Sequence, residues 1–330
     1  MDKQLPWHEP LWQQFRAQVS HDRLPHALLL SGIAGLGKGV FARRMAQALL
    51  CETPTASGDG CDGCRFCHLF YAGSHPDYRV LMPEEKSGVI KVDAVRELCA
   101  FLDYTAQYGG HKIALLESAD CLNGYAANSL LKTLEEPSAG SVLLLITTQP
   151  VRLPATVRSR CQRINFVPPS SQMALSWLAQ QVRADIDPEL VLEVSGGAPL
   201  TALSNVQSEY WHRRQELFTG YQQLQSGRGD PLQVAEAWAI GNVVENLRWL
   251  IGWHTDLIRL KMDCHAPCLS HPDLYLLLQA GIQQQSLPRL FERLDAAIHL
   301  HHLCTTTQVN THMQLEAFFS GSALNHSDTF

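Results

Sequence analysis

Hydrophobic residues in the first half of the chain form short runs that alternate with longer segments of helical periodicity. Short continuous apolar runs are typical of strands buried on both faces of a sheet, and the longer periodic segments are typical of amphipathic helices. Strands are predicted at 27–30, 78–82, 112–116 and 142–147, and helices at 40–50, 93–103 and 126–134. This alternation predicts an α/β fold in which helices flank a parallel sheet.

The second half of the chain has a different pattern, which predicts helices alone. Segment 166–171 contains two adjacent prolines followed by two serines, so we expect it to end the α/β unit and to start the next helix. Apolar residues recur at helical spacing from Leu247 to Ile258, and His254 and Lys261 are the polar exceptions on this stripe. Three domains are predicted, at 1–167, 168–206 and 207–330.

Composition and charge exclude several classes of protein. The 330 residues are 45% hydrophobic and 18% charged, which is ordinary for a globular chain and argues against disorder. The first residues show no basic stretch leading into an apolar core, and no later run approaches the length of a membrane span, so we expect a cytoplasmic protein. A net charge of −6 gives no general attraction to nucleic acid, so any DNA contact would be local or made through partners.

A phosphate-binding loop follows the first predicted strand and is complete up to its last residue. In the motif G-x-x-x-x-G-K-[ST], glycines let backbone N–H groups surround phosphates, the lysine meets the outer phosphates and the final hydroxyl holds Mg²⁺. The chain has Gly32, Gly35, Gly37 and Lys38 in place, but Gly39 replaces the serine or threonine. Because ATP hydrolysis needs that metal, the loop indicates ATPase ancestry without ATPase activity.

The residues after the strand at 112–116 show a second loss in the same chemistry. P-loop ATPases end such a strand with one acidic residue that holds Mg²⁺ through water and another that orients the attacking water. The chain has Glu117, Ser118 and Asp120 here, so a serine occupies the place of the water-orienting carboxylate. Two independent losses favour a non-hydrolysing protein over a working ATPase.

Four cysteines crowd into one short stretch between the first and second predicted strands. Cys51, Cys61, Cys64 and Cys67 have the spacing C-x9-C-x2-C-x2-C, which lets four thiolates close a tetrahedral metal site. Zinc is the favoured metal, and its role would be structural because four cysteines leave no open coordination position. An iron–sulfur cluster is an alternative, although the common ferredoxin run places its fourth cysteine downstream. Four unrelated reduced thiols remain the other alternative.

Other cysteines and histidines carry weaker signals. Cys264 and Cys268, with His265 and His271, can in principle bind a metal, but the polar end of a helix followed by a turn is the favoured interpretation of this segment. The remaining isolated cysteines are interpreted as small core residues, and they are Cys99, Cys121 and Cys304.

Taken together, the motifs resemble those of the bacterial clamp-loader AAA+ family. The resemblance covers about residues 26 to 203 and rests on five features. These are the P-loop, the four-cysteine insertion, His75-Pro76-Asp77, the run from Leu130 to Pro137 (LLKTLEEP), and Ser159-Arg160-Cys161. The degenerate ATPase motifs resemble those of a non-hydrolysing member of the family rather than gamma/tau, which keeps them.

The resemblance implies roles for individual residues. Arg160 matches the arginine finger that enters the ATP site of the neighbouring subunit, and a planar guanidinium suits the stabilisation of a transferring phosphoryl group. Without the resemblance, a surface salt bridge would be the favoured interpretation of Arg160. Leu200 and Thr201 occupy the places of an arginine and an acidic residue in the second sensor element, which removes a third nucleotide contact. ATP binding is therefore expected to be weak or absent.

The resemblance also implies a function and partners. It implies an AAA+ module, a small helical lid and an all-α collar that holds a hetero-pentameric ring with gamma/tau and delta subunits. The ring would load the beta clamp on primed DNA, and the chain would be a non-catalytic subunit of a complex with DNA-directed DNA polymerase (nucleotidyltransferase) activity. Two alternatives stay open: a self-sufficient AAA+ ATPase or helicase-like remodelling enzyme, and a stand-alone zinc-dependent DNA-binding module, which the acidic charge disfavours.

Overall fold

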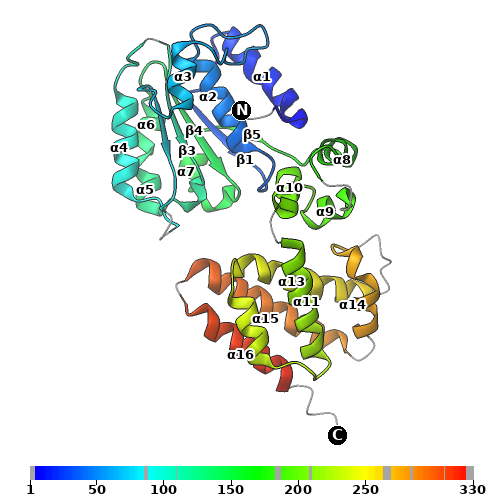
Figure 1. Cartoon of the computed structure of the whole chain (residues 1–330). Coiled ribbons are helices and arrows are strands. Elements are labelled where there is room, and N and C mark those ends of the chain that lie inside the picture. The colour runs from blue at the N-terminus through cyan, green and yellow to red at the C-terminus, as the bar shows by residue number, and fades with distance from the viewer. Residues whose placement is uncertain are drawn as a thin grey trace. The chain divides into compact units, whose positions relative to one another are not determined.

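The computed structural model describes residues 4–84, 88–108, 110–182, 187–207, 210–262, 269–282, 285–307 and 309–324. The chain divides into two compact units, which are labelled by element in Figure 1. The first unit comprises Met1–Trp177 and Ala198–Thr201, and the second comprises Leu178–Gly197 and Ala202–Phe330. The three-part division expected from the sequence stays a prediction.

The first unit is an α/β structure built on a five-stranded parallel sheet with the order β2-β3-β4-β1-β5. Its strands are β1 (Ala27–Ser31), β2 (Tyr78–Leu81), β3 (Lys112–Leu116), β4 (Ser141–Thr147) and β5 (Gln162–Asn165). Its α-helices are α1 (Glu9–Ser20), α2 (Lys38–Leu50), α3 (Arg65–Tyr71), α4 (Val92–Asp103), α5 (Gly124–Ser129), α6 (Leu131–Glu135), α7 (Ala155–Arg158) and α8 (Ser171–Leu178). Short 3₁₀ helices are η1 (Pro6–His8), η2 (Ala119–Cys121) and η3 (Pro150–Arg152).

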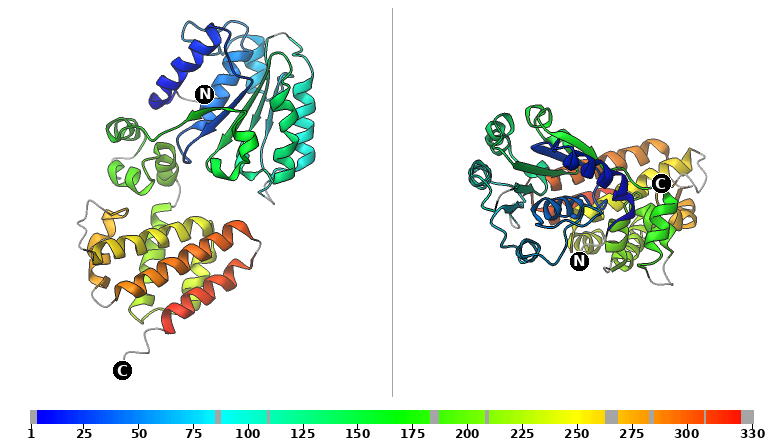
Figure 2. Two further views of the ribbon diagram at one scale, coloured as in Figure 1. Left: turned by 180° about the vertical axis from the view of Figure 1, so that it is seen from behind. Right: turned by 90° about the horizontal axis from the view of Figure 1, so that it is seen from above.

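Alternation along the strands divides the core of this unit between the two faces of the sheet. Leu28 and Leu30 of β1 pack with Phe41 and Met45 of α2, on the face that α1 also covers. Leu29 faces the opposite way and joins a second cluster made largely with α4, α5 and α6. Figure 2 shows the sheet between these two helical layers. The central strands β1, β3 and β4 are buried along their whole length, as parallel strands covered on both faces require.

The predicted fold class is confirmed, and the four predicted strands are present within one residue at each end. The helix expected at 126–134 is instead two short helices, α5 and α6, that meet at Leu130. Helix α1 and strand β5 were not predicted from the sequence. The strand β5 lies at an edge of the sheet and buries only Ile164, so it lacks the apolar run that marked the central strands.

The second unit is helical throughout its described residues. It contains α9 (Pro188–Val194), the part of α10 (Pro199–Gln207) that follows Thr201, α11 (Tyr210–Gln225), α12 (Pro231–Ala239), α13 (Val243–Lys261), α14 (Tyr275–Ile282), α15 (Leu287–Thr306), α16 (Thr311–Leu324) and the 3₁₀ helix η5 (Pro272–Leu274). The predicted stripe lies on α13, and its polar member His254 is fully buried and hydrogen-bonded to the hydroxyl of Tyr221 at 3.0 Å. Trp238, Trp253 and Phe319 fill the same core.

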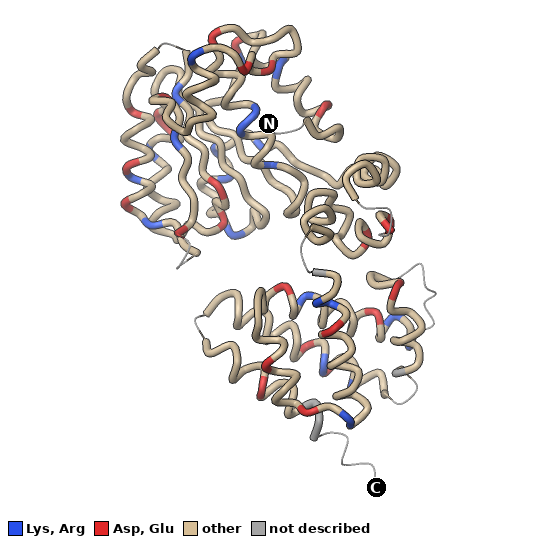
Figure 3. Tube along the Cα trace, viewed as in Figure 1, with Lys and Arg blue, Asp and Glu red and all other residues tan. Residues whose placement is uncertain are grey.

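Charged residues of both signs are interspersed along the described traces of both units (Figure 3). Among the described residues, no helix combines the length and the apolar character that crossing a membrane requires.

Candidate functional site

The P-loop, residues 32–39, joins β1 to α2 as the motif predicts. Lys38 begins α2 and is 5% exposed, and its amine donates hydrogen bonds to the carbonyl oxygens of Gly32 and Ile33 at 2.7 and 2.6 Å. Burial lowers the pKa of Lys38 to about 8, against the opposing charge of Asp120. The lysine that meets phosphates in a working loop is thus bonded to the loop itself.

The segment before β1 covers the P-loop from one side. The indole nitrogen of Trp7 and the Nε2 of His8 donate hydrogen bonds to the carbonyl oxygen of Leu36, at 2.9 and 2.8 Å. Burial lowers the pKa of His8 to about 4, so its imidazole is neutral and Nε2 carries the proton at neutral pH. A Cβ atom on Gly37, whose φ is +82°, would lie 2.4 Å from Leu5 and 2.9 Å from His8. Only a glycine fits beneath this cover.

The start of α10 covers the loop from another side. The backbone N–H of Leu200 donates to the carbonyl oxygen of Gly35 at 3.1 Å. Thr201 lies so close that a Cβ atom on Gly35 would meet its hydroxyl oxygen at 2.0 Å. The two residues expected to occupy the places of the polar sensor pair are thus in contact with the P-loop.

Gly39 stands where the P-loop motif has a serine or threonine, and the structure leaves room for a side chain at this position. A Cβ atom there would meet only Ile146, at 4.0 Å, so a side chain is sterically possible but absent. Glu117 forms an ion pair of 2.5 Å with Arg43 of α2. Asp120 accepts hydrogen bonds from the hydroxyl of Thr147 at 2.8 Å and from the backbone of Thr148 at 3.1 Å. Both carboxylates therefore have protein partners.

The four cysteines beyond the end of α2 converge on one point. All four sulfur atoms lie within 4.8 Å of one another, and the thiols are free. The sulfurs of Cys51 and Cys64 are 3.8 Å apart. Sulfur atoms placed tetrahedrally about 2.3 Å from Zn²⁺ would be about 3.8 Å from one another, so the donor set and its spacing fit this ion. Cys51, Cys61, Cys64 and Cys67 form the cysteine cluster.

Backbone and side-chain donors surround these sulfurs. The N–H groups of Cys61, Cys64 and Cys67 donate to the sulfurs of Cys51, Cys61 and Cys64 respectively, at 3.2 to 3.4 Å. Hydrogen bonds from Thr53 and Gly63 lower the pKa of Cys61 to about 6, whereas burial raises the pKa of Cys67 to about 12. Because a metal binds thiolates, binding would displace a proton from Cys67 at neutral pH.

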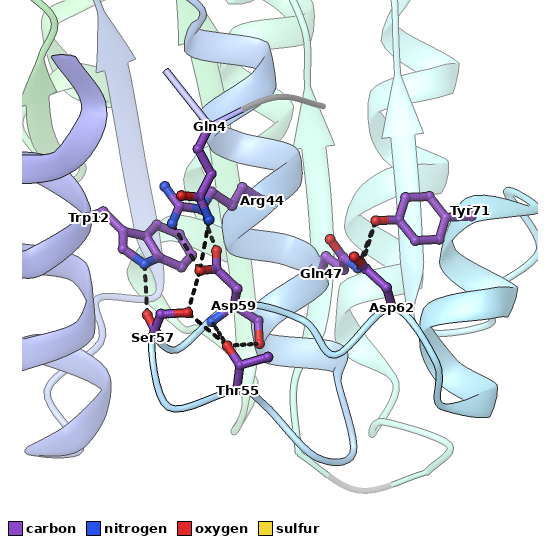
Figure 4. Close-up of polar contacts among 9 residues, drawn as sticks. All are labelled: Gln4, Trp12, Arg44, Gln47, Thr55, Ser57, Asp59, Asp62 and Tyr71. Carbon is purple, nitrogen blue, oxygen red and sulfur yellow. Dashed lines mark hydrogen bonds and ion pairs between the residues drawn. The ribbon is translucent and has the colours of Figure 1, made fainter. Parts of the chain in front are cut away.

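The loop between Cys51 and Cys61 is fastened to α1 and α2 (Figure 4). Arg44 of α2 pairs with both oxygens of Asp59, at 2.5 and 3.1 Å, and its guanidinium lies 3.7 Å from the ring centre of Trp12. The indole of Trp12 donates to the carbonyl oxygen of Ser57 at 3.1 Å, and the Ser57 hydroxyl donates to Asp59 at 2.8 Å. The cysteine segment therefore packs on the helix that starts at the P-loop.

Arg160 lies in the turn between α7 and β5, and its side chain is 36% exposed. Its guanidinium forms an ion pair of 2.6 Å with Glu135, the last residue of α6, and donates to the carbonyl oxygen of Thr156 at 2.9 Å. The salt bridge of the simpler interpretation is thus present. Glu135 belongs to the LLKTLEEP motif, but no pattern in the sequence pairs it with Arg160.

Several residues that contact the P-loop or the cysteine segment were not predicted as part of a site. Trp7, His8 and Arg44 lie in segments whose apolar pattern carried no motif. Of the weaker signals, Cys264, His265 and Cys268 lie outside the described residues. Cys99, Cys121 and Cys304 are half-buried at the margins of hydrophobic clusters, which agrees in part with their interpretation as core residues.

The fold and these sites define an AAA+-like P-loop protein: a five-stranded parallel sheet with a P-loop after β1, a four-cysteine segment and a helical C-terminal part. Two family models match the chain. One, described as DNA polymerase III, delta subunit, matches residues 7–170, and one described as DNA polymerase III, delta subunit, C terminal, matches residues 208–319.

Curated proteins agree with the family models. The chain is 38% identical to DNA polymerase III subunit delta' of Pseudomonas aeruginosa over 276 residues, which are 83% of each chain. It is 32% identical to DNA polymerase III subunit delta' of Yersinia pestis, over 94% of this chain and 92% of that one. A shorter match at 39% identity, to DNA polymerase III subunit tau of Salmonella typhimurium, covers 45% of this chain and 22% of tau.

The chain belongs to the family of DNA polymerase III subunit delta'. The expected resemblance to clamp-loader AAA+ proteins is thereby confirmed, and the match to tau relates the family to the gamma/tau type.

Proposed function

We propose that the chain is a non-hydrolysing subunit of the sliding-clamp loader and acts on ATP held by a neighbouring subunit. The observation that carries the proposal is the contrast between its two nucleotide-related features. Lys38 is buried and bonded to its own loop, whereas Arg160 stays at the surface. In this proposal, gamma/tau and delta subunits complete a hetero-pentameric ring that loads the beta clamp on primed DNA in the cytoplasm.

Absence of hydrolysis follows from three missing groups. Gly39 supplies no hydroxyl for Mg²⁺, Ser118 supplies no carboxylate for the attacking water, and Leu200 supplies no cation for the nucleotide. The cover formed by Trp7, His8 and Thr201 also supports weak or absent binding of ATP, because phosphates would have to displace their contacts with the loop.

Arg160 is the residue proposed to act in trans, as an arginine finger. An exposed ion pair such as Arg160–Glu135 contributes only about 0–1 kcal/mol, so it can open at little cost when a phosphate is within reach. A guanidinium then offers two parallel N–H donors to the charge that develops on the transferring phosphoryl group. This role rests on the match to the Ser-Arg-Cys motif and on the exposure of the side chain.

The cysteine cluster is proposed to hold one structural Zn²⁺ with no part in chemistry. The ion would supply a cross-link between the end of α2, the segment 53–60 and the start of α3. The four sulfurs leave no open coordination position for water or substrate.

The domain roles are also part of the proposal. Residues 1–167 would form the AAA+ body, residues 168–206 the lid and residues 207–330 the collar through which the ring assembles. The helical character of α11 to α16 agrees with such a collar but carries no motif of its own.

Substitution of Lys38 distinguishes this proposal from the main alternative, a self-sufficient ATPase. Lys38→Met keeps the apolar stem of the buried side chain and removes the amine. Purified wild-type protein and the variant are both expected to show no ATP turnover above background. A ring reconstituted with the variant is expected to hydrolyse ATP at the wild-type rate. Turnover by the isolated wild-type chain that disappears in Lys38→Met would contradict the proposal.

A further inference from the structure

The cysteine cluster has a polar surrounding in which Gln47 of α2 takes a central place. The side-chain amide of Gln47 lies 2.6 Å from an oxygen of Asp62, 3.1 Å from the hydroxyl of Tyr71 and 3.6 Å from the sulfur of Cys67. Figure 4 shows Gln47, Asp62 and Tyr71 turned toward one another. One side chain of α2 thus contacts both arms of the cluster, because Asp62 follows Cys61 and Tyr71 ends the helix that contains Cys67.

Asp62 has a backbone conformation that needs support. Its φ is +58°, in the left-handed region that residues other than glycine rarely adopt. One of its carboxylate oxygens accepts from Gln47 at 2.6 Å and from the Tyr71 hydroxyl at 2.7 Å. The two donors hold the side chain of Asp62, and hence the turn that carries Cys61 and Cys64, against α2 and α3.

Gly60 provides the space that Gln47 occupies. A Cβ atom at Gly60 would lie 2.7 Å from both the Cδ and the Nε2 of Gln47, closer than real Cβ contacts come. A larger residue at position 60 would displace the amide. The φ of Gly60 is not in the left-handed region, so this glycine serves the close approach and not a turn.

We propose that Gln47 is a positioning residue of the metal site, which holds Asp62 and donates to the sulfur of Cys67 so that the four sulfurs are preset around the ion. This inference rests on the metal site proposed above. Groups that bond to metal ligands typically change metal affinity by about 10–100-fold when they are removed. Gln47 also ties the metal to α2, the helix whose other end begins at the P-loop.

Release of Zn²⁺ from the full chain to a chromogenic chelator tests the inference. Gln47→Leu, which removes the donors, is expected to release Zn²⁺ about 10-fold faster than wild type. Gln47→Glu is expected to release Zn²⁺ at least as fast as Gln47→Leu does, because the new carboxylate places a negative charge beside Asp62 and the Cys67 thiolate. Gly60→Ala is expected to act in the same direction by displacing the amide. Gln13→Leu is the matched control, since Gln13 is exposed on α1 and bonds Glu9.

Co²⁺ substitution separates positioning from a general loss of stability. The thiolate-to-cobalt absorption band is expected to shift in Gln47→Leu and to stay unchanged in Gln13→Leu, because only the former loses a donor to a ligand sulfur. Zn²⁺ bound by wild type but released at the wild-type rate by both Gln47 variants would overturn this inference alone. A wild-type chain that binds no Zn²⁺ would overturn the metal site and the inference with it.

Discussion

The two ends of α2 carry the two motifs that are clearest in the sequence, and these motifs differ in how their polar groups are bonded. At the N-terminal end, the P-loop keeps its glycines and its lysine. Its groups are nevertheless bonded to the chain itself: Lys38 to Gly32 and Ile33, and Leu36 to Trp7 and His8. Beyond the C-terminal end, the cysteine sulfurs face one another at distances that suit a metal.

A motif records ancestry, whereas the partners of its polar atoms indicate present use. We expect a P-loop whose lysine is bonded to its own carbonyl oxygens to bind phosphate weakly or not at all. The sulfurs of the cysteine cluster also accept hydrogen bonds, from backbone N–H groups and from Gln47, but such donors favour the thiolates that a metal would bind.

Removal of a cysteine is expected to have the largest effect. Cys64→Ser should lower bound Zn²⁺ from about one equivalent per chain to almost none, because a closed site needs all four ligands. The segment 51–67 should then lose several kcal/mol of stability, within the limit of about 10–16 kcal/mol that structural zinc provides in small domains. Elemental analysis and hydrogen exchange of the segment 51–67 would measure both changes. Retained metal, or iron in place of zinc, would contradict the prediction.

Acid is expected to have the second-largest effect, through His8 beside the P-loop. The folded pKa of His8 is about 4 and the unfolded value is about 6.5, so above pH 6.5 neither state binds the proton. Between pH 6.5 and 4 only the unfolded state does, and stability should fall by about 3 kcal/mol. His8→Gln keeps a donor for Leu36 and should remove this loss. Urea unfolding at several pH values, with the exposed His21→Gln as control, would measure it. An equal acid response in wild type and His8→Gln would contradict the prediction.

Loss of the contact between the cysteine segment and α2 should have a smaller effect. Asp59→Asn removes the charge that faces Arg44, in a pair whose side chains are only 16% and 12% exposed. The expected cost is about 1–2 kcal/mol, between the values for exposed and buried pairs. Asp93→Asn is the matched control, since Asp93 forms an exposed ion pair with Arg96 and its loss should change stability by less than about 0.5 kcal/mol. Equal costs for the two variants would show that the loop is not fastened there.

Gly39→Ser should have the smallest effect. The position has room for a side chain, and serine in place of glycine in the first turn of α2 should stabilise the helix by about 0.5 kcal/mol or less. ATP turnover should stay at background, because Ser118 and Leu200 remain. Hydrolysis gained by this single substitution would mean that the other two losses do not disable the site.

Much of the α/β unit could be predicted because its central strands are buried on both faces and read as continuous apolar runs. The edge strand β5 and helix α1 could not, since their patterns are short or interrupted by polar residues. The cysteine cluster was predictable because four cysteines at this spacing are typical of a metal site. Contacts between distant segments were not, and the pairs His8–Leu36, Thr201–Gly35 and Arg160–Glu135 depend on tertiary packing that no local pattern records.

Steady-state ATP hydrolysis by the reconstituted ring would show whether Arg160 acts on the ATP of a neighbouring subunit. Arg160→Ala should leave assembly intact by gel filtration. Hydrolysis at the adjoining site should slow by about 10³-fold or more. The total rate should fall only in part, because the other sites of the ring do not use Arg160. Arg160→Lys should not fully restore it, because a point charge lacks the planar fork. Arg96→Ala, at another exposed arginine, should hydrolyse ATP as wild type does. An unchanged rate of ATP hydrolysis in an intact Arg160→Ala ring would contradict the proposed role of Arg160.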